Sequence, residues 1–120
     1  MRVGIDTIEL ERVSIEDKFI KRIACEREEK YIRNYKCENG LRQRTAALWC
    51  VKEAVMKALG LGKDSGVTMK EIELMHEESG RPYVKLSGVA QKKFEEIGCS
   101  EIEISLSHSE TIATAICICK

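Results

Sequence analysis

The chain is organised around one apolar stretch, Thr45-Ala46-Ala47-Leu48-Trp49-Cys50-Val51-Lys52-Glu53-Ala54-Val55-Met56-Lys57-Ala58-Leu59-Gly60. Its length and its content of Ala, Leu and Met predict a helix that is opened by Arg42-Gln43-Arg44 and ends at Gly60. Because this helix is apolar on almost every side, most of its surface should be buried. Glu53 and Lys57 are exceptions that share one stripe of the helix. They either form a surface ion pair or stand at the mouth of a cleft.

The length and charge of the chain narrow the classes of protein to consider. A chain of 120 residues is expected to form a single domain, residues 1–120, with its own core. Its 20 Lys and Arg residues balance its 20 Asp and Glu residues, so overall charge does not favour nucleic acid binding. The apolar run at residues 3–5 is too short for a signal peptide, and no stretch reaches the length of a membrane span. We therefore expect a cytoplasmic protein with no nucleic acid or membrane partner.

The six cysteines contain no C-x-x-C pair. In a protein with no secretory route they are expected to stay reduced and to act as small apolar core residues. Cys117 and Cys119 have strand spacing, so their side chains should share a face of that strand. A zinc site is the less favoured alternative.

Hydrophobic periodicity predicts nine helices and strands in the order β-α-α-α-β-β-α-β-β. Such an order indicates an α+β fold, in which an antiparallel sheet packs against the long central helix. The predicted strands cover residues 2–8, 67–76, 83–86, 101–107 and 111–119. The predicted helices besides the central one cover residues 15–24, 26–36 and 87–97.

Two carboxylates and a lysine are candidates for a catalytic site. Asp6 falls on or just past the end of the first strand, where it is either a turn-forming carboxylate or half of a metal site. Together, Asp6 and Glu53 suit Mg²⁺, which commonly bridges protein carboxylates to substrate phosphate. Lys57 can add a point charge on the same phosphate, and His108 with flanking hydroxyl groups offers donors to a second anion. These parts are typical of phosphoryl-type transfer.

Four short motifs, taken in their order along the chain, resemble those of the holo-[acyl carrier protein] synthase family of 4'-phosphopantetheinyl transferases. The most specific motif has an aromatic residue followed by x-x-K-E-[AS]-x-x-K, here residues 49–57. The others are Gly4-Ile5-Asp6, Gly80-Arg81-Pro82-Tyr83 and Ser105-Leu106-Ser107-His108. The chain length matches that of the compact bacterial members, so the resemblance spans nearly the whole chain.

The resemblance implies a fold, a reaction and a catalytic site. The enzyme would move the phosphopantetheine arm of coenzyme A to a serine of apo acyl carrier protein and release adenosine 3',5'-bisphosphate, in support of fatty acid biosynthesis. Asp6 and Glu53 would hold Mg²⁺, Glu53 would help to deprotonate the serine, and Lys57 would neutralise phosphate charge. The compact members form homotrimers, with each site in a cleft between protomers.

The resemblance also implies which residues bind the substrates. His108 and a neighbouring serine, Ser107 or Ser109, would hold the 3'-phosphate. Many members carry an arginine where this chain has Leu48, and Arg42 or Arg44 would take its place in binding the nucleotide. The adenine would lie near Gly80, Arg81 and Pro82, and the acidic helix of the carrier would meet Arg12, Lys18, Lys21 and Arg22.

Two other classes of function compete with this one. A non-catalytic domain that binds acyl carriers or forms trimers would not need Asp6, Glu53 and Lys57 together. A Mg²⁺-dependent phosphohydrolase would use water in place of the serine, although no lid sequence is evident. Lys52 either extends its amine to the surface or aids phosphate binding. His76 is expected to be structural or exposed.

Overall fold

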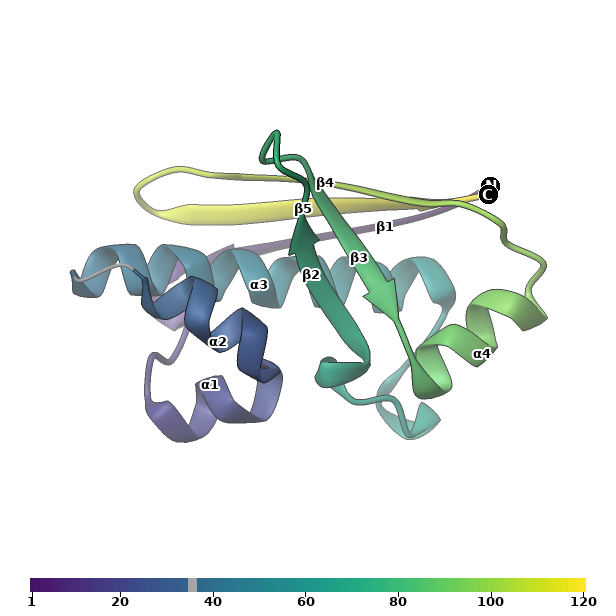
Figure 1. The fold of residues 1–120 in the computed structure, drawn as a ribbon, viewed down its shortest axis with the longest axis horizontal. Coiled ribbons are helices and arrows are strands. Elements are labelled where there is room, and N and C mark those ends of the chain that lie inside the picture. The colour runs from purple at the N-terminus through teal and green to yellow at the C-terminus, as the bar shows by residue number, and fades with distance from the viewer. Residues whose placement is uncertain (35–36) are drawn as a thin grey trace.

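The computed structural model describes residues 1–34 and 37–120, so positions 35 and 36 of the second predicted helix lie outside the described residues. The main elements follow the predicted order, and the α+β class is confirmed (Figure 1). They are β1 (Arg2–Glu9), α1 (Asp17–Ile23), α2 (Glu26–Arg33), α3 (Glu38–Leu59), β2 (Ile72–His76), β3 (Pro82–Leu86), α4 (Gly88–Glu96), β4 (Ile102–His108) and β5 (Ile112–Cys119). Three 3₁₀ turns join them: η1 (Leu10–Arg12), η2 (Lys63–Ser65) and η3 (Met69–Glu71).

The strands form two antiparallel sheets instead of one. The larger sheet has the order β1-β5-β4, and β2 pairs with β3 in a separate hairpin. The register places Asp6 of β1 opposite Ala115 of β5, which in turn lies opposite Leu106 of β4. The two chain ends lie side by side at one end of the larger sheet (Figure 1).

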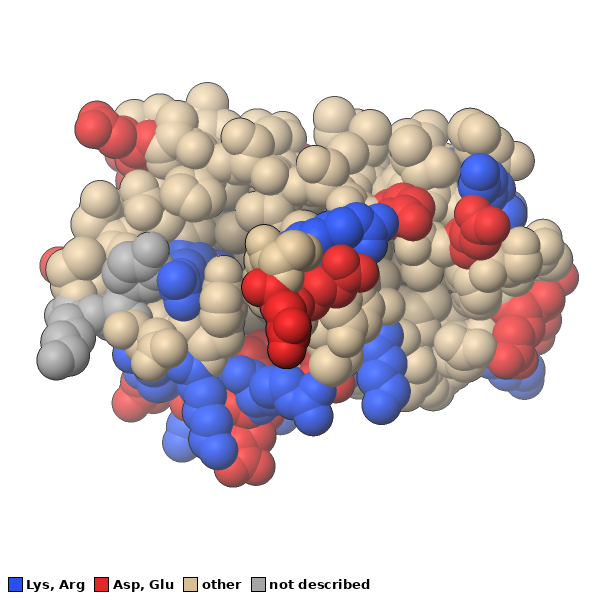
Figure 2. Space-filling view, turned by 45° about the horizontal axis from the view of Figure 1, so that its top comes forward, with Lys and Arg blue, Asp and Glu red and all other residues tan. Residues whose placement is uncertain are grey.

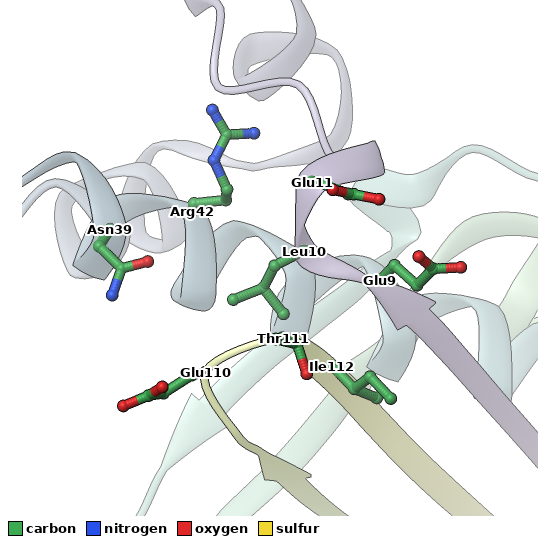
Figure 3. A pocket seen from close by; sticks show the side chains of 8 residues that line it. All are labelled: Glu9, Leu10, Glu11, Asn39, Arg42, Glu110, Thr111 and Ile112. Carbon is green, nitrogen blue, oxygen red and sulfur yellow. The ribbon is translucent and has the colours of Figure 1, made fainter.

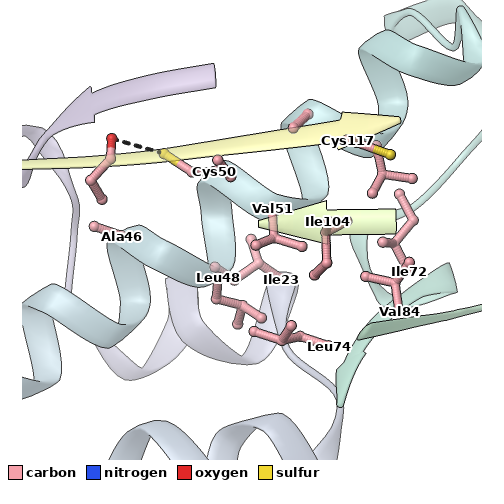
Figure 4. Packing of buried hydrophobic residues seen from close by; sticks show 14 of the residues in the cluster. Ile23, Ala46, Leu48, Cys50, Val51, Ile72, Leu74, Val84, Ile104 and Cys117 are labelled. Atoms are coloured by element: carbon pink, nitrogen blue, oxygen red, sulfur yellow. Dashed lines mark hydrogen bonds between the residues drawn. The ribbon is translucent and has the colours of Figure 1, made fainter. Parts of the chain in front are cut away.

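Helix α3 lies along one face of the larger sheet, with α1, α2 and the β2–β3 hairpin on its other sides (Figure 1). Its apolar side chains Leu48, Val51, Val55 and Leu59 are almost completely buried, as predicted. Figure 4 shows the neighbours that cover them, which are Ile23, Ile72, Leu74, Val84, Ile104 and Cys117. Among the residues that the structure describes, no helix is long and apolar enough to cross a membrane.

The boundaries of α3 follow from its two caps. It begins at Glu38, earlier than predicted, because the Cys37 side chain accepts a hydrogen bond from the backbone N–H of Gly40 at 3.3 Å. It ends at the predicted position because Gly60 adopts the left-handed conformation, with a φ of 72°. The Leu61 N–H then closes the end of the helix by donating to the Met56 carbonyl at 2.8 Å.

Gly4 allows β1 to pack directly on α3. A Cβ atom at Gly4 would lie 2.5 Å from the backbone nitrogen of Ala58 and would overlap the carbonyl of Ala54. Only a glycine lets the strand and the helix backbone approach this closely. This contact places the next residue on the same face of β1, Asp6, directly against α3.

Caps formed by Glu71 shape the starts of β2 and α4, and the predicted start of β2 was wrong. The strand predicted from residue 67 begins at Ile72, because Thr68 and Glu71 form a capping box around the turn η3. Ser87 stands at the N-cap of α4 but its side chain makes no capping hydrogen bond. The Glu71 carboxylate takes that role by accepting from the Val89 N–H at 2.6 Å.

Candidate active site

Asp6 lies in the middle of β1 and is not a turn residue. It lies on the face of the strand that packs on α3, and its side chain is only 15% exposed. The Lys57 ammonium is 3.0 Å from its carboxylate, across 51 positions of the chain. The same ammonium donates to the Ile5 carbonyl at 3.0 Å. Lys57 therefore ties the end of α3 to β1. Its ion pair with Asp6 joins the helix to the strand and does not form within the helix.

Glu53 is half-buried and lies close enough to Asp6 for the two carboxylates to affect each other. Burial raises the pKa of Glu53, the negative charge of Asp6 raises it further, and Lys57 and Lys63 oppose the shift. A carboxylate with a raised pKa is a better proton acceptor, because its conjugate acid is closer to neutral pH. The structure thus brings together the three residues that the sequence singled out for catalysis.

Cys50 forms the buried floor of this cluster. Its thiol donates to the Ala113 carbonyl at 3.4 Å (Figure 4). Burial raises the pKa of Cys50 to about 12, and the charge of Asp6 adds to the shift. Because the thiol stays protonated at neutral pH, we assign it a packing role and no nucleophilic one.

The Asp6 and Glu53 carboxylates have the donor chemistry that suits a hard cation. Two oxygen-bearing side chains close to each other, one of them with a raised pKa, favour a positive ion between them. Mg²⁺ needs only one or two protein carboxylates, since it keeps several waters. No group of three or more His, Cys, Asp or Glu side chains within residues 1–34 and 37–120 could hold a metal ion.

His108 and Arg44 line a second, separate cavity of about 130 Å³ at the end of β4. Gly80 and Pro82 line the depression next to it, which shares Tyr31 and His76 with the cavity. The residues of the cavity are Tyr31, Gln43, Arg44, Ala47, Leu74, His76, Leu106 and His108.

Tyr31 and His76 were not predicted as site residues, and they form the wall of this cavity. Their rings stack with centroids 4.6 Å apart, and the Arg44 guanidinium lies 4.1 Å from the Tyr31 ring centroid. Arg44 also donates to the Tyr31 carbonyl at 2.7 Å. Burial lowers the pKa of His76, and the positive charge of Arg44 lowers it further. An exposed tyrosine on a charged helix gave no sequence signal for this stack.

Three other nucleotide-site candidates make different contacts. Arg42 donates to the Val13 carbonyl and lines a different cavity of about 630 Å³, beside Glu9, Glu11 and Glu110 (Figure 3). Arg81 forms ion pairs with Glu77 and Glu103. The Ser109 hydroxyl accepts from the N–H groups of Thr111 and Ile112 at 3.3 Å, which fixes the β4–β5 turn. Ser107 is exposed on β4 but lies on the opposite face of the strand from Leu106 and His108, so it does not line the cavity.

The carboxylate cluster and the His108 cavity do not meet within one chain. Asp6 belongs to β1 and His108 to β4, which are the two outer strands of the larger sheet. On α3, Arg44 and Glu53 are nine residues apart. That spacing corresponds to about 13 Å along the axis and half a turn around it, so they point to opposite sides.

Three of the four predicted carrier-binding cations share one exposed face of α1. Lys18, Lys21 and Arg22 have the i, i+3, i+4 spacing of helical neighbours, whereas Arg12 lies at the end of η1. Beside them is a mainly apolar groove of about 600 Å³. It is lined by Phe19, Arg22, Ile23, Trp49, Thr68, Met69 and Lys70.

Lys52 fits neither of the two roles considered for it. Its side chain is completely buried and its ammonium lies 2.8 Å from the carboxylate of Glu28, which is also buried. The lysine therefore neither reaches the surface nor contacts a bound phosphate. This partner could not be predicted, because Glu28 belongs to a highly charged helix whose pattern indicates an exposed surface.

The site, taken together, suits a particular class of chemistry. Two carboxylates can hold a divalent cation, a lysine can neutralise phosphate charge, and a carboxylate with a raised pKa can accept a proton. An α+β domain with this site has the parts of an enzyme that transfers a phosphate-linked group.

Comparisons with known proteins agree with this class. A sequence profile of the 4'-phosphopantetheinyl transferase superfamily matches residues 2–117. The holo-[acyl-carrier-protein] synthase of Ruminiclostridium cellulolyticum is 36% identical over 123 residues, which cover 98% of this chain and 90% of that protein. The one from Solibacter usitatus is 36% identical over 117 residues, covering 93% and 91%.

A solved structure gives the same result for the fold. The holo-(acyl-carrier-protein) synthase of Bacillus anthracis, crystallised in complex with CoA (3',5'-ADP), has a TM-score of 0.81 and 30% identity. The match covers 98% of this chain and 94% of that one. The chain therefore belongs to the 4'-phosphopantetheinyl transferase superfamily, as an enzyme of the holo-[acyl-carrier-protein] synthase type. The family resemblance inferred from the motifs is confirmed.

Proposed function

We propose that the enzyme transfers the 4'-phosphopantetheine group of coenzyme A to a serine of apo acyl carrier protein, with Mg²⁺, in the cytoplasm. Adenosine 3',5'-bisphosphate is the second product, and the holo carrier serves fatty acid biosynthesis. The observation that carries the proposal is the Asp6–Lys57 ion pair, whose two charges both act on the nearby Glu53, in a member of this family. The six free cysteines fit a reducing compartment.

The chemistry uses each of these three residues differently. The serine oxygen forms a bond to the phosphorus next to pantetheine, and the bond from that phosphorus to the bridging pyrophosphate oxygen breaks. Glu53 accepts the hydroxyl proton, for which its raised pKa is suited. Lys57 stabilises the negative charge that develops on the phosphate oxygens. Asp6 orients Lys57 through their ion pair and, with Glu53, would hold Mg²⁺, which when bound neutralises pyrophosphate charge.

The nucleotide half of coenzyme A is assigned to the cavity of His108 and Arg44. The Arg44 guanidinium and the His108 imidazole offer donors to the 3'-phosphate, and the Tyr31–His76 stack offers an apolar face to adenine. Because this cavity and the Asp6–Glu53 cluster lie on opposite sides of one chain, one coenzyme A molecule would bridge two protomers. We therefore propose a homotrimer with shared sites.

The exposed face of the larger sheet supports this assembly. Val3 and Ile5 are 63% and 60% exposed, and Ile112, Ile116 and Ile118 extend the apolar area along β5. In Figure 2 the upper part of the molecule is mostly free of charged side chains, which gather at its two ends. An apolar area of this kind usually marks an interface between proteins.

Light scattering is expected to give a mass near three times the 13.6 kDa of one chain. Ile116→Glu puts a charge in the middle of the apolar face and should produce monomers that are folded but inactive. A fully active monomer, in the wild type or in the variant, would contradict the shared site.

A charge reversal on α1 tests the carrier surface. We expect Lys18→Glu with Arg22→Glu to raise the KM for apo carrier about tenfold at low salt, because rim charges steer association. The KM for coenzyme A should stay near that of the wild type, since phosphate recognition lies elsewhere. Steady-state kinetics with each substrate varied in turn makes the measurement.

The matched control reverses two exposed lysines away from α1, Lys85→Glu on β3 with Lys92→Glu on α4. This control should leave both KM values unchanged. Added salt should raise the KM for apo carrier more in the wild type than in the α1 variant. An equal loss toward both substrates would mean that α1 supports the fold or the trimer, and no loss would move carrier docking elsewhere.

Intact mass spectrometry of apo carrier protein, incubated with the enzyme, coenzyme A and Mg²⁺, tests the function itself. A mass gain of one phosphopantetheine is the expected result. Release of nucleotide without a gain would identify a hydrolase, and binding of the carrier with neither change would identify a non-catalytic carrier-binding domain.

A further inference from the structure

Two buried charged side chains, Glu28 and Lys52, form a node that the catalytic site does not use. Both side chains are at most 1% exposed, and the Lys52 ammonium lies 2.8 Å from the Glu28 carboxylate. Burial lowers the pKa of Lys52, and the charge of Glu28 opposes this shift. Buried ion pairs of this kind often stabilise a fold no better than apolar side chains of the same volume. The presence of the pair therefore calls for an explanation other than stability.

The contacts of the node suggest what it does, because they join four elements. The Glu28 carboxylate accepts from the Cys25 N–H at the start of α2 at 3.0 Å and from the Leu74 N–H of β2 at 2.7 Å. The Lys52 ammonium donates to the Met69 carbonyl of η3 at 2.8 Å. This last bond links the node to the groove beside α1, because Met69 lines that groove. The Leu74 bond links it to the His108 cavity, which Leu74 lines.

That groove and the catalytic face of α3 share one short segment of the helix, residues 49–53. Trp49 lies in the groove, Lys52 follows it by less than one turn, and Glu53 is the next residue. Lys52 thus connects the wall of the groove, through the Met69 carbonyl, to the segment of α3 that carries Glu53. Hydrogen bonds from a buried ammonium constrain the distance and direction of their acceptors, which apolar packing alone does not do.

We infer that Lys52 is a positioning residue that holds η3 against α3 and so sets the shape of the groove in which the carrier protein docks. The inference rests on the proposed function, because it takes the groove beside α1 as the carrier surface. Glu28 neutralises the buried ammonium and ties it to α2 and β2. The bond to η3 comes from Lys52.

Two variants separate positioning from stability. Lys52→Met removes the bond to the Met69 carbonyl, whereas Glu28→Gln removes the negative charge and keeps the lysine donor to η3. Breaking either half of a buried pair destabilises the fold, so thermal unfolding should show a loss for both. Only Lys52→Met is expected to raise the KM for apo carrier, by about tenfold, with the KM for coenzyme A within about twofold of the wild type.

Lys30→Met is the matched control, and Lys52→Gln is the second variant at the tested position. Lys30→Met makes the same substitution on α2 at a side chain that is 80% exposed, and it should change neither constant. If Lys52→Met does not fold, Lys52→Gln replaces it, since the shorter amide weakens the same bond. We expect Lys52→Gln also to raise the KM for apo carrier, by a smaller factor than Lys52→Met. A KM equal to that of the wild type would overturn the inference. Equal carrier KM values for Lys52→Met and Glu28→Gln would also overturn it.

A second readout does not depend on turnover. Trp49 is the single tryptophan of the chain and lines the groove with Met69. Acrylamide should quench its fluorescence more strongly in Lys52→Met than in the wild type or in Glu28→Gln. If the wild type transfers no phosphopantetheine, the proposed function fails while this measurement still tests the position of η3. Unchanged quenching in a folded Lys52→Met variant would refute the positioning role.

Discussion

Replacing Glu53 by glutamine is expected to lower kcat at least about 10³-fold, because a positioned general base contributes up to about 10⁴-fold. Glutamine keeps the size of the side chain but can neither accept the serine proton nor bind a cation as a carboxylate. Asp6→Asn should cause a loss of similar order, since it removes the second carboxylate and the ion pair with Lys57. The measurement is the initial rate of holo carrier formation.

Thermal unfolding without metal provides the control for folding. The pKa of Glu53 is raised above its ordinary value of 4.5 in the folded state, first by burial and then by Asp6. A carboxylate with a raised folded pKa costs stability as pH rises through that pKa, because the folded state must then hold the unfavoured charged form. Glu53→Gln removes this cost, so at neutral pH its Tm should be equal to or higher than that of the wild type.

Metal removal is the complementary test. Chelation should abolish transfer by the wild type, and added Mg²⁺ should restore it. Mg²⁺ should also raise the Tm of the wild type and leave that of Glu53→Gln unchanged, because only the ionised carboxylate favours the folded, metal-bound state. Full activity in excess chelator, or a Glu53→Gln variant with a normal rate, would contradict the metal and base roles.

Gly4→Ala is expected to destabilise the protein by at least about 3 kcal/mol, at the upper end of the cost of overpacking. The new methyl group would meet the backbone of α3 at Ala54 and Ala58, which cannot move aside as a side chain would. For a chain of this length the Tm should fall by roughly 10 °C or more. Calorimetry or circular dichroism would measure the change.

The activity of this variant should fall further than its stability explains. Any shift that relieves the contact moves β1 away from α3 and carries Asp6 away from Lys57, which are now 3.0 Å apart. Gly62→Ala is the matched control, because nothing lies within 4 Å of a Cβ atom there. A Gly4→Ala protein with the stability and kcat of the Gly62→Ala control would show that the close packing does not matter.

Much of the fold could be predicted because its signals are local. The apolar character of residues 45–59 predicted the buried helix, and Gly60 predicted where it ends. Strict alternation predicted β4, and a continuous apolar run predicted β5, each to within a residue at both ends. Boundaries failed where an unforeseen cap decided them, as with Cys37 at the start of α3 and the Thr68–Glu71 capping box before β2.

Some residues of the candidate site could also be predicted from local spacing, and others could not. Glu53 and Lys57 lie on one stripe of a helix, so their proximity follows from the helical repeat alone. The positions of Arg42, Arg81 and Ser109 could not be predicted, because each side chain has a backbone or carboxylate partner that only the packed chain supplies. The Tyr31–His76 stack was missed for the same reason, since its two residues belong to different elements.

Residue spacings along the chain were enough to predict the helices and strands, the buried face of the central helix and the motifs that place the chain in its family. These depend on spacings of two to four residues, which the backbone repeat converts directly into a shared face. The tertiary structure alone decided that Asp6 meets Lys57, that Lys52 is buried against Glu28, and that His108 lies away from the carboxylates. Such contacts depend on strand register and on how closely β1 packs on α3, which are set by the packing of the whole core and not by any local repeat.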